Sequence, residues 1–365
     1  MPVPLFDTRT PVAPLIDAIQ AKVGEVIQGS QFILGPEVGA FESELADYLG
    51  ARHAIGVGNG TDAITLALRA LGVGPGDEVV VPSFTFYASA EAIPLTGARP
   101  VFCDIDPETF CVTAETVKAA LTPRTKAVIV VHLFGNVAPV AEIEALGVPV
   151  LEDAAQAIGS RSSEGRAGAL GTAATLSFFP SKNLGAFGDG GAVVTSDDEV
   201  ADRVRMLRFH GSRDKTTFEM VGHNSRLDEM QAAILRVQLP HLDTWADGRR
   251  QGAANYREAG LGELVDLPVP VDGCEPAWHL YVIRHERADE LAAALKAAGI
   301  GQKAYYRVPT HEQPAMREYT PAVPLPGTAE AARTHLAIPM SPVLSGEQAA
   351  EVVAAVRDAG LGRPH

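Results

Sequence analysis

Residues 175–195 read TLSFFPSKNLGAFGDGGAVVT, and the rest of the chain is organised around this stretch. Its two ends, TLSFF and GAVVT, have the apolar and β-branched composition of buried strands. The turn between them presents one lysine, Lys182, among phenylalanines and glycines. Burial beside apolar side chains lowers the pKa of a lysine and makes its amine a nucleophile. The alternative is an ordinary exposed lysine in a loop.

Seven short apolar runs alternate with helical stretches in the first two thirds of the chain. They are AIGVG (54–58), DEVVVP (77–82), RPVFCDI (99–105), TKAVIVVHLF (125–134), VPVLEDA (148–154), TLSFF (175–179) and GAVVT (191–195). This alternation predicts an α/β fold, with a mostly parallel, seven-stranded sheet covered by helices. Later segments suggest a smaller α+β domain. We therefore expect a large domain over residues 1–245 and a small one over residues 246–365.

Composition and charge narrow the possible partners and the location of the protein. The chain has 365 residues, of which 46% are hydrophobic, and a formal net charge of −15 without a compensating basic run. We therefore expect neither nucleic acid nor a membrane as a partner. Three cysteines without CxxC spacing predict no disulfide framework and no metal site. No secretory or membrane-spanning pattern is visible, so we expect a cytoplasmic protein.

The carboxyl ends of the predicted strands are where ligands gather in such a sheet. The stretch GVGNGTDAITLAL (56–68) leads from a glycine-rich turn into a helix near Thr61, whose free N–H groups form an anion site. The alternative is a tight strand-to-helix turn. The match to the dinucleotide pattern GxGxxG is imperfect, which is poor support for a nicotinamide-dependent oxidoreductase.

Three further strand ends carry functional groups. Phe86 lies in an aromatic cluster suited either to ring stacking or to core packing. Asp153 ends an apolar strand, where a carboxylate needs a cation or hydrogen-bond donors, and its alternative role is a helix cap. Ser177 and Lys182 flank the turn of residues 175–195. Together with the anion site, these groups meet the demands of pyridoxal 5'-phosphate, whose ring acts as an electron sink.

The order of these motifs resembles the DegT/DnrJ/EryC1/StrS family of sugar aminotransferases, within the fold type I (aspartate aminotransferase-like) enzymes. The motifs that carry the resemblance are GNGTDAITLAL, GDEVVVPSFTF, VLEDAAQAIGS, SFFPSKNLGAFGDGGAVVT and NSRLDEMQAA. It implies that Lys182 forms the internal aldimine and moves the proton. It also implies that Asp153 pairs with the pyridinium nitrogen, Gln156 bonds the ring hydroxyl and Phe86 stacks on the ring.

The same resemblance implies a phosphate site and a shared active site. Backbone groups at Gly60 and Thr61, with the Ser177 hydroxyl, are expected to hold the cofactor phosphate. Asn224 is expected to reach the phosphate of a neighbouring subunit in a homodimer. The donor is expected to be an amino acid, L-glutamate, and the acceptor a keto group on a nucleotide-linked sugar.

The lysine loop and a later loop bear on the substrate. The loop sequence FFPSKNLGAFGDGG is similar to that of family members that act on 3-oxo sugars. A UDP-linked 2-acetamido-3-oxo sugar and a dTDP-linked 3-oxo-6-deoxyhexose both stay open as substrates. Residues 303–316, KAYYRVPTHEQPAM, resemble the family's substrate loop. Tyr306 and His311 match it, whereas Arg307 stands where proline is common. All three are expected to bind substrate, with a solvated surface arginine as the alternative for Arg307.

Other functions stay open at this point. A nucleotide-sugar 4-aminotransferase and an aminocyclitol aminotransferase are the alternatives within the family. A regulatory protein that binds pyridoxal 5'-phosphate without turnover is the alternative from another class, because a fold does not fix a function. Loss of Lys182, Asp153 or the substrate loop would favour it, and all three are present.

Overall fold

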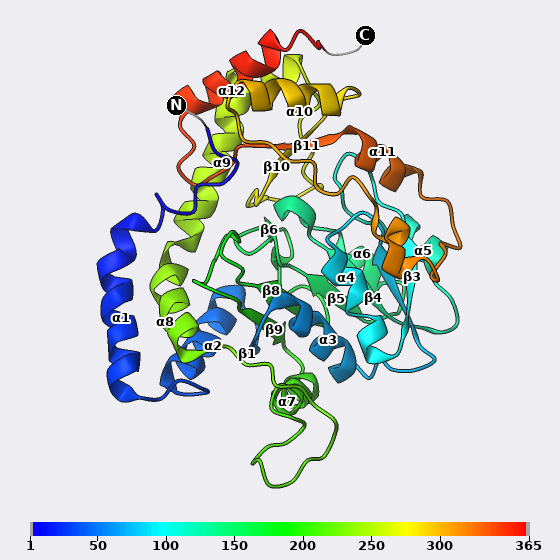
Figure 1. The fold of residues 1–365 in the computed structure, drawn as a ribbon. Coiled ribbons are helices and arrows are strands. Elements are labelled where there is room, and N and C mark those ends of the chain that lie inside the picture. Colours follow the sequence, from blue (N-terminus) through cyan, green and yellow to red (C-terminus); the bar gives the residue numbers. More distant parts are fainter. Residues whose placement is uncertain (1–2, 363–365) are drawn as a thin grey trace.

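The computed structural model describes residues 3–362, and a seven-stranded sheet lies at its centre (Figure 1). The strands, in spatial order, are β1 His53–Val57, β9 Gly191–Thr195, β8 Ala173–Ser177, β5 Val150–Asp153, β4 Thr125–Val131, β2 Glu78–Pro82 and β3 Arg99–Cys103. Strand β9 runs antiparallel to both of its neighbours, and the other pairs are parallel. The predicted mostly parallel, seven-stranded sheet is therefore confirmed.

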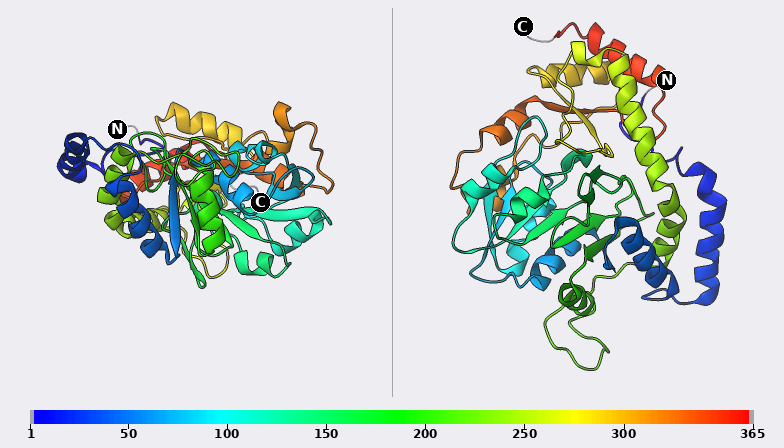
Figure 2. Two further views of the ribbon diagram at one scale, coloured as in Figure 1. Left: turned by 90° about the horizontal axis from the view of Figure 1, so that it is seen from below. Right: turned by 180° about the vertical axis from the view of Figure 1, so that it is seen from behind.

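Helices cover both faces of this sheet (Figure 2). They are α2 Pro36–Leu49, α3 Gly60–Ala70, α4 Tyr87–Glu91, α5 Ala114–Ala120, α6 Val140–Glu144, α7 Asp198–Leu207 and α8 Glu229–Gln238, whereas α1 Ile16–Gly29 packs on α8 at the outer edge. Alternate residues of β9 enter different cores. Val193 belongs to the core that contains α3 and α7, whereas Ala192 and Val194 belong to the core that contains α2 and α8. Burial on both faces explains why the strands are apolar runs rather than alternating ones.

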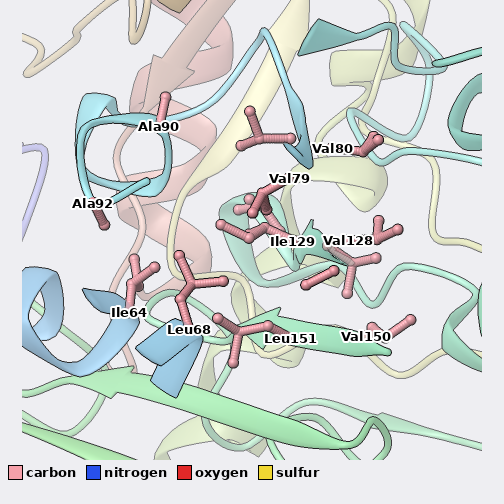
Figure 3. Packing of buried hydrophobic residues seen from close by; sticks show 14 of the residues in the cluster. Ile64, Leu68, Val79, Val80, Ala90, Ala92, Val128, Ile129, Val150 and Leu151 are labelled. Carbon is pink, nitrogen blue, oxygen red and sulfur yellow. The ribbon is translucent and has the colours of Figure 1, made fainter. Parts of the chain in front are cut away.

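The packing of α3 on the central strands is seen in Figure 3. Ile64 and Leu68 lie one helical turn apart, and they join valines and leucines of β2, β4 and β5 in one core. Both side chains are at most 2% exposed, and burial of each stabilises the fold by about 1.5–3 kcal/mol. The Asn59 side chain caps this helix by accepting the N–H of Asp62 at 2.8 Å. The start of α3 is therefore held firmly against the carboxyl ends of the strands.

A smaller unit follows, at the top of Figure 1. It contains α9 Leu242–Glu258, β10 Tyr281–Arg284, α10 Ala288–Ala297, α11 Pro326–Thr334, β11 His335–Ile338 and α12 Gly346–Asp358. Strands β10 and β11 pair antiparallel. Leu242 packs in a core of the large sheet, whereas Ala253 and Tyr256 pack with the smaller unit. The predicted division near residue 245 thus falls within α9, and it stays a prediction.

Two short strands complete the described elements, and both lie between β5 and β8 in sequence. They are β6 Arg161–Ser162 and β7 Gly165–Arg166. Among residues 3–362, no helix is long and apolar enough to cross a membrane.

Candidate active site

A cavity of about 710 Å³ lies where the strands of the large sheet end. Its lining includes the last residues of β4, β5 and β8 and the first residues of α3. Eight of the predicted site residues line it: Gly60, Thr61, Phe86, Asp153, Gln156, Ser177, Lys182 and Tyr306. The sheet topology thus brings together residues that lie up to 246 positions apart in the chain, from Gly60 to Tyr306.

Lys182 enters this cavity from the turn between β8 and β9. Its backbone N–H donates to the carbonyl of Phe179 at 2.8 Å, which closes the turn. A Cβ atom at Gly185 would lie 2.6 Å from the carbonyl oxygen of Pro180, so glycine is required there. Burial lowers the pKa of Lys182 to about 8, although the carboxylate of Asp153 opposes this shift. About one tenth of the amine is therefore neutral at pH 7, far more than for a lysine of ordinary pKa.

Asp153, the last residue of β5, is 6% exposed. Its Oδ2 accepts a hydrogen bond from Ser89 Oγ at 2.7 Å, and its Oδ1 accepts the N–H of Ala155 at 3.2 Å. Among residues 3–362, no arginine or lysine lies within ion-pair distance of this carboxylate. A buried carboxylate without a cation is costly, so the site suits a ligand that brings a protonated nitrogen.

Three side chains define the walls beside Asp153. Gln156 Oε1 accepts the N–H of Phe134 at 2.7 Å, while its Nε2 donates to the hydroxyl of Tyr306 at 3.3 Å. Burial raises the pKa of Tyr306, which keeps its hydroxyl protonated. Phe86 is 54% exposed, and its ring centre lies 6.0 Å from that of Tyr306. An exposed ring at the cavity edge provides a surface on which a planar ligand stacks.

The start of α3 faces the same cavity. The first N–H groups of a helix have no partner within the helix, and the helix dipole favours an anion near them. A Cβ atom at Gly60 would lie 2.8 Å from the Cβ of Ser177, so glycine allows β8 to approach the helix start. Gly60, Thr61 and Ser177 therefore form one polar end of the cavity, suited to a phosphate group.

Three predicted residues lie outside this cavity. Arg307 Nη1 donates to the carbonyl groups of Ala332 and Arg333 at 2.8 and 2.7 Å, and its Nη2 pairs with Asp289 at 2.6 Å. The arginine thereby fastens the loop of residues 303–316 to the end of α11. Its predicted substrate contact stays a prediction.

His311 and Asn224 are also placed elsewhere. His311 Nδ1 lies 2.5 Å from Ser83 Oγ, and the histidine lines a separate hollow of about 230 Å³. Asn224 is exposed and follows α7. The roles predicted for both residues stay predictions.

The cavity also contains residues that the sequence did not reveal. His279 lies in it, buried, with its Nδ1 3.3 Å from Asn183 Oδ1. Burial, with the charges of Lys182 and Arg249, keeps the pKa of His279 well below its ordinary value. Ser89 donates a hydrogen bond to Asp153 from helix α4, one turn beyond Phe86. Its position shortly after the end of a predicted strand could have marked it as a site residue. Within residues 3–362, no group of acidic, histidine or cysteine side chains is arranged to hold a metal ion.

Comparison with known sequences gives a match over nearly the whole chain. The profile of the DegT/DnrJ/EryC1/StrS aminotransferase family matches residues 15–357. A pleiotropic regulatory protein of Geobacillus stearothermophilus is 48% identical over 97% of both chains. The dTDP-3-amino-3,4,6-trideoxy-alpha-D-glucose transaminase of Streptomyces venezuelae is 46% identical over 98% of this chain and 96% of its own. The UDP-N-acetyl-3-dehydro-alpha-D-glucosamine 3-aminotransferase of Acidithiobacillus ferrooxidans is 44% identical over 97% of both chains.

Solved structures agree with these matches. The crystal structure of S. venezuelae DesV in complex with a ketimine intermediate superposes with a TM-score of 0.94, at 45% identity, over 98% of both chains. The structure of NtdA from Bacillus subtilis with bound cofactor PMP has a TM-score of 0.86 and 30% identity, covering 94% of this chain and 81% of its own.

Proposed function

This chain belongs to the DegT/DnrJ/EryC1/StrS aminotransferase family, and from that membership we propose which amino group it moves and to where. It transfers the amino group of L-glutamate to the 3-oxo carbon of a nucleotide-linked sugar. The observation that carries the proposal is the pairing, in one cavity, of the Lys182 amine with the buried, cation-free carboxylate of Asp153. The relatives named for 3-amino sugars support the position of the new amine.

Pyridoxal 5'-phosphate fits this cavity by the chemistry of its lining. Among residues 3–362, no arginine or lysine forms an ion pair with the buried carboxylate of Asp153, and the first N–H groups of α3 face the same cavity, where the helix dipole favours a phosphate. When bound, the cofactor supplies an electron sink for charge that develops at the reacting carbon. The residues that would hold it are Gly60, Thr61, Phe86, Asp153, Gln156, Ser177 and Lys182.

The residues of the cavity have separate roles in the reaction. Lys182 Nζ, with its lowered pKa, accepts the proton that the donor's carbon releases and returns it to the product. Asp153 holds a proton on the nitrogen that faces it, and the Ser89 hydroxyl fixes the orientation of its carboxylate. The rings of Phe86 and Tyr306 restrict water at the cavity edge. In the second half of the exchange, the same groups act in reverse on the sugar.

The test is a screen of amino-sugar nucleotides in the reverse direction, with 2-oxoglutarate as acceptor. UDP- and dTDP-linked 3-amino sugars should yield glutamate, whereas matched 4-amino sugars and an aminocyclitol should not. Glutamate formation from the 4-amino sugars alone would replace the proposal with the 4-amination alternative.

A homodimer with shared active sites is part of the proposal. Asn224 is exposed and lies outside the cavity of its own chain. A residue that acts in the active site of a second copy is expected in such a position. Phe86 and Phe179, which line the cavity, are each more than half exposed, as apolar side chains that a second copy covers would be. Mixed dimers that carry Lys182→Ala on one chain and Asn224→Ala on the other should retain part of the activity. Dimers whose chains behave independently would contradict the shared site.

A regulatory role without turnover is the second candidate, because one similar relative is named a pleiotropic regulatory protein. The intact cavity, with Lys182 and Asp153 both in place, favours turnover instead. The amino-sugar screen separates the two, since a regulator without turnover forms no glutamate from any amino sugar.

A further inference from the structure

A second pocket, of about 150 Å³, lies beside Lys182 on the side of helix α9. The early residues of the chain, the lysine turn and α9 form its walls. It shares Phe6, Ser181 and Lys182 with the large cavity, so it is a side chamber of the active site. The feature that calls for explanation is Arg249, which α9 contributes to this chamber.

Arg249 is a buried cation without a carboxylate. The residue is 6% exposed, and among residues 3–362 no aspartate or glutamate forms an ion pair with it. Its Nη1 donates to the carbonyl groups of Trp278 and His279, at 3.1 and 3.5 Å, while its buried Nε has no hydrogen-bond partner in the described part of the chain. Burial lowers the pKa of Arg249 to about 10, and no neighbouring carboxylate raises it again. A buried charge with unmet donors is costly unless a ligand supplies the counter-charge.

The acidic residue that lines the chamber does not supply it. The Oδ1 atom of Asp7 accepts the N–H groups of Arg9 and Thr10, at 3.1 and 2.9 Å, and so holds a turn of the early chain. The chamber therefore brings Arg249 and Lys182 to one small space, and among residues 3–362 its one lining carboxylate, Asp7, forms no ion pair with Arg249. An arginine guanidinium matches the planar shape of a carboxylate, which it can bind with two parallel hydrogen bonds.

We infer that this side chamber is the subsite for a carboxylate of the amino donor, and of the 2-oxo acid that the donor becomes. The inference rests on the proposed function, because it assigns a place to the donor of that reaction. The chamber opens next to Lys182, the residue that handles the donor's proton, and Arg249 supplies the positive charge. Trp245 also lines the chamber, four residues before Arg249 on the same helix.

The probe is glutarate, a dicarboxylate that lacks an amino or oxo group and so binds without reacting. Its affinity for the cofactor-loaded protein is measured by isothermal titration calorimetry. Arg249→Met should weaken binding about tenfold to a hundredfold, the range for losing a charge-assisted hydrogen-bonded pair. Arg250→Met is the matched control, because Arg250 pairs with Asp247 at 2.6 Å and does not line the chamber. Equal affinity in the Arg249→Met protein would overturn the inference, as would phosphate or chloride competing as well as a carboxylate.

Arg249 also donates hydrogen bonds to the backbone of Trp278 and His279, so a second variant is needed that leaves these bonds in place. Thr8→Phe covers that case, because it places a ring in the chamber and leaves Arg249 intact. It should weaken glutarate about tenfold while the melting temperature stays unchanged. Unaltered glutarate binding in a folded Thr8→Phe protein would refute the subsite. A wild-type protein that binds glutarate through Arg249 but aminates no sugar would refute the proposed function alone.

Discussion

The large cavity and the loop of residues 303–316 both carry predicted site residues, but the structure treats them differently. In the cavity, Asp153 and Ser177 converge because β5 and β8 are neighbours in one sheet, and Lys182 follows in the turn after β8. In the loop, Tyr306 reaches the cavity, whereas Arg307 binds the end of α11. The direction of a side chain at a strand end is thus set by the sheet and can be predicted. The direction of a side chain in a loop depends on the partners that the folded chain brings near it.

The largest expected effect is on a residue of the large cavity. Lys182→Ala should lower the amination rate by about 10⁴-fold or more, because it removes both the nucleophile and the proton carrier. Borohydride reduction of the wild-type protein, followed by peptide mapping, should place the cofactor label on Lys182. Ordinary turnover by the alanine variant, or a label on another lysine, would show that the cavity is not the reaction site.

Asp153→Asn tests the carboxylate at the end of β5. The amide keeps the shape of the side chain and still accepts a hydrogen bond from Ser89, but it loses the negative charge. The turnover number should fall about 10²–10³-fold, as when one charged group that stabilises a transition state is removed. Ser89→Ala is the control and should cost far less, about tenfold. An asparagine variant with wild-type kinetics would remove the charge of Asp153 from the mechanism.

Much of the convergent region follows from the sequence. The apolar runs fix the strands, and the strand ends then fix where Asp153 and Ser177 lie. The structure explains two glycines of these motifs: a Cβ atom at Gly185 would meet the carbonyl of Pro180 in the same turn, and one at Gly60 would meet Ser177 on β8. Local pattern and sheet topology agree here, which is why this part of the site was predictable.

The rest depended on contacts that are distant in sequence. Arg307 binds residues 25 and 26 positions further along, and His311 meets Ser83 across 228 positions. No periodicity or motif encodes such contacts, so the direction of these side chains could not be read from the loop. His279 and Arg249 were missed for the same reason, because only the folded chain brings α9 and the segment before β10 beside Lys182.

The pH dependence of Lys182 sharpens the comparison further. Burial lowers the pKa of its amine from 10.5 to about 8, and the charge of Asp153 raises it in opposition. In the cofactor-free protein, the rate of Lys182 labelling by an amine reagent should therefore rise with pH through a midpoint near 8. Asp153→Asn should move this midpoint to lower pH, because it removes the charge that stabilises the ammonium form. Mass spectrometry of the Lys182 peptide measures both, and an upward move of the midpoint would contradict the assigned coupling.

The smallest expected effect belongs to the loop. Arg307→Leu cuts the bonds to α11 and to Asp289, so the loop that carries Tyr306 loses its anchor. The protein should lose about 1–2 kcal/mol of stability, and the KM for the nucleotide sugar should rise about threefold to tenfold. The half-reaction with glutamate should be unchanged, since the anchor does not touch Lys182.

Arg333→Leu is the matched control for this loop variant. Arg333 lies at the end of the same helix and pairs with Glu286, away from the loop. Its loss should leave the KM for the sugar unchanged, because an exposed ion pair contributes little and holds no part of the cavity. An equal rise in KM for both variants would mean that α11 itself, rather than the Arg307 anchor, positions Tyr306. A rise for Arg307→Leu alone would make this loop the part of the site in which substrate preference can change while the strand-end chemistry stays the same.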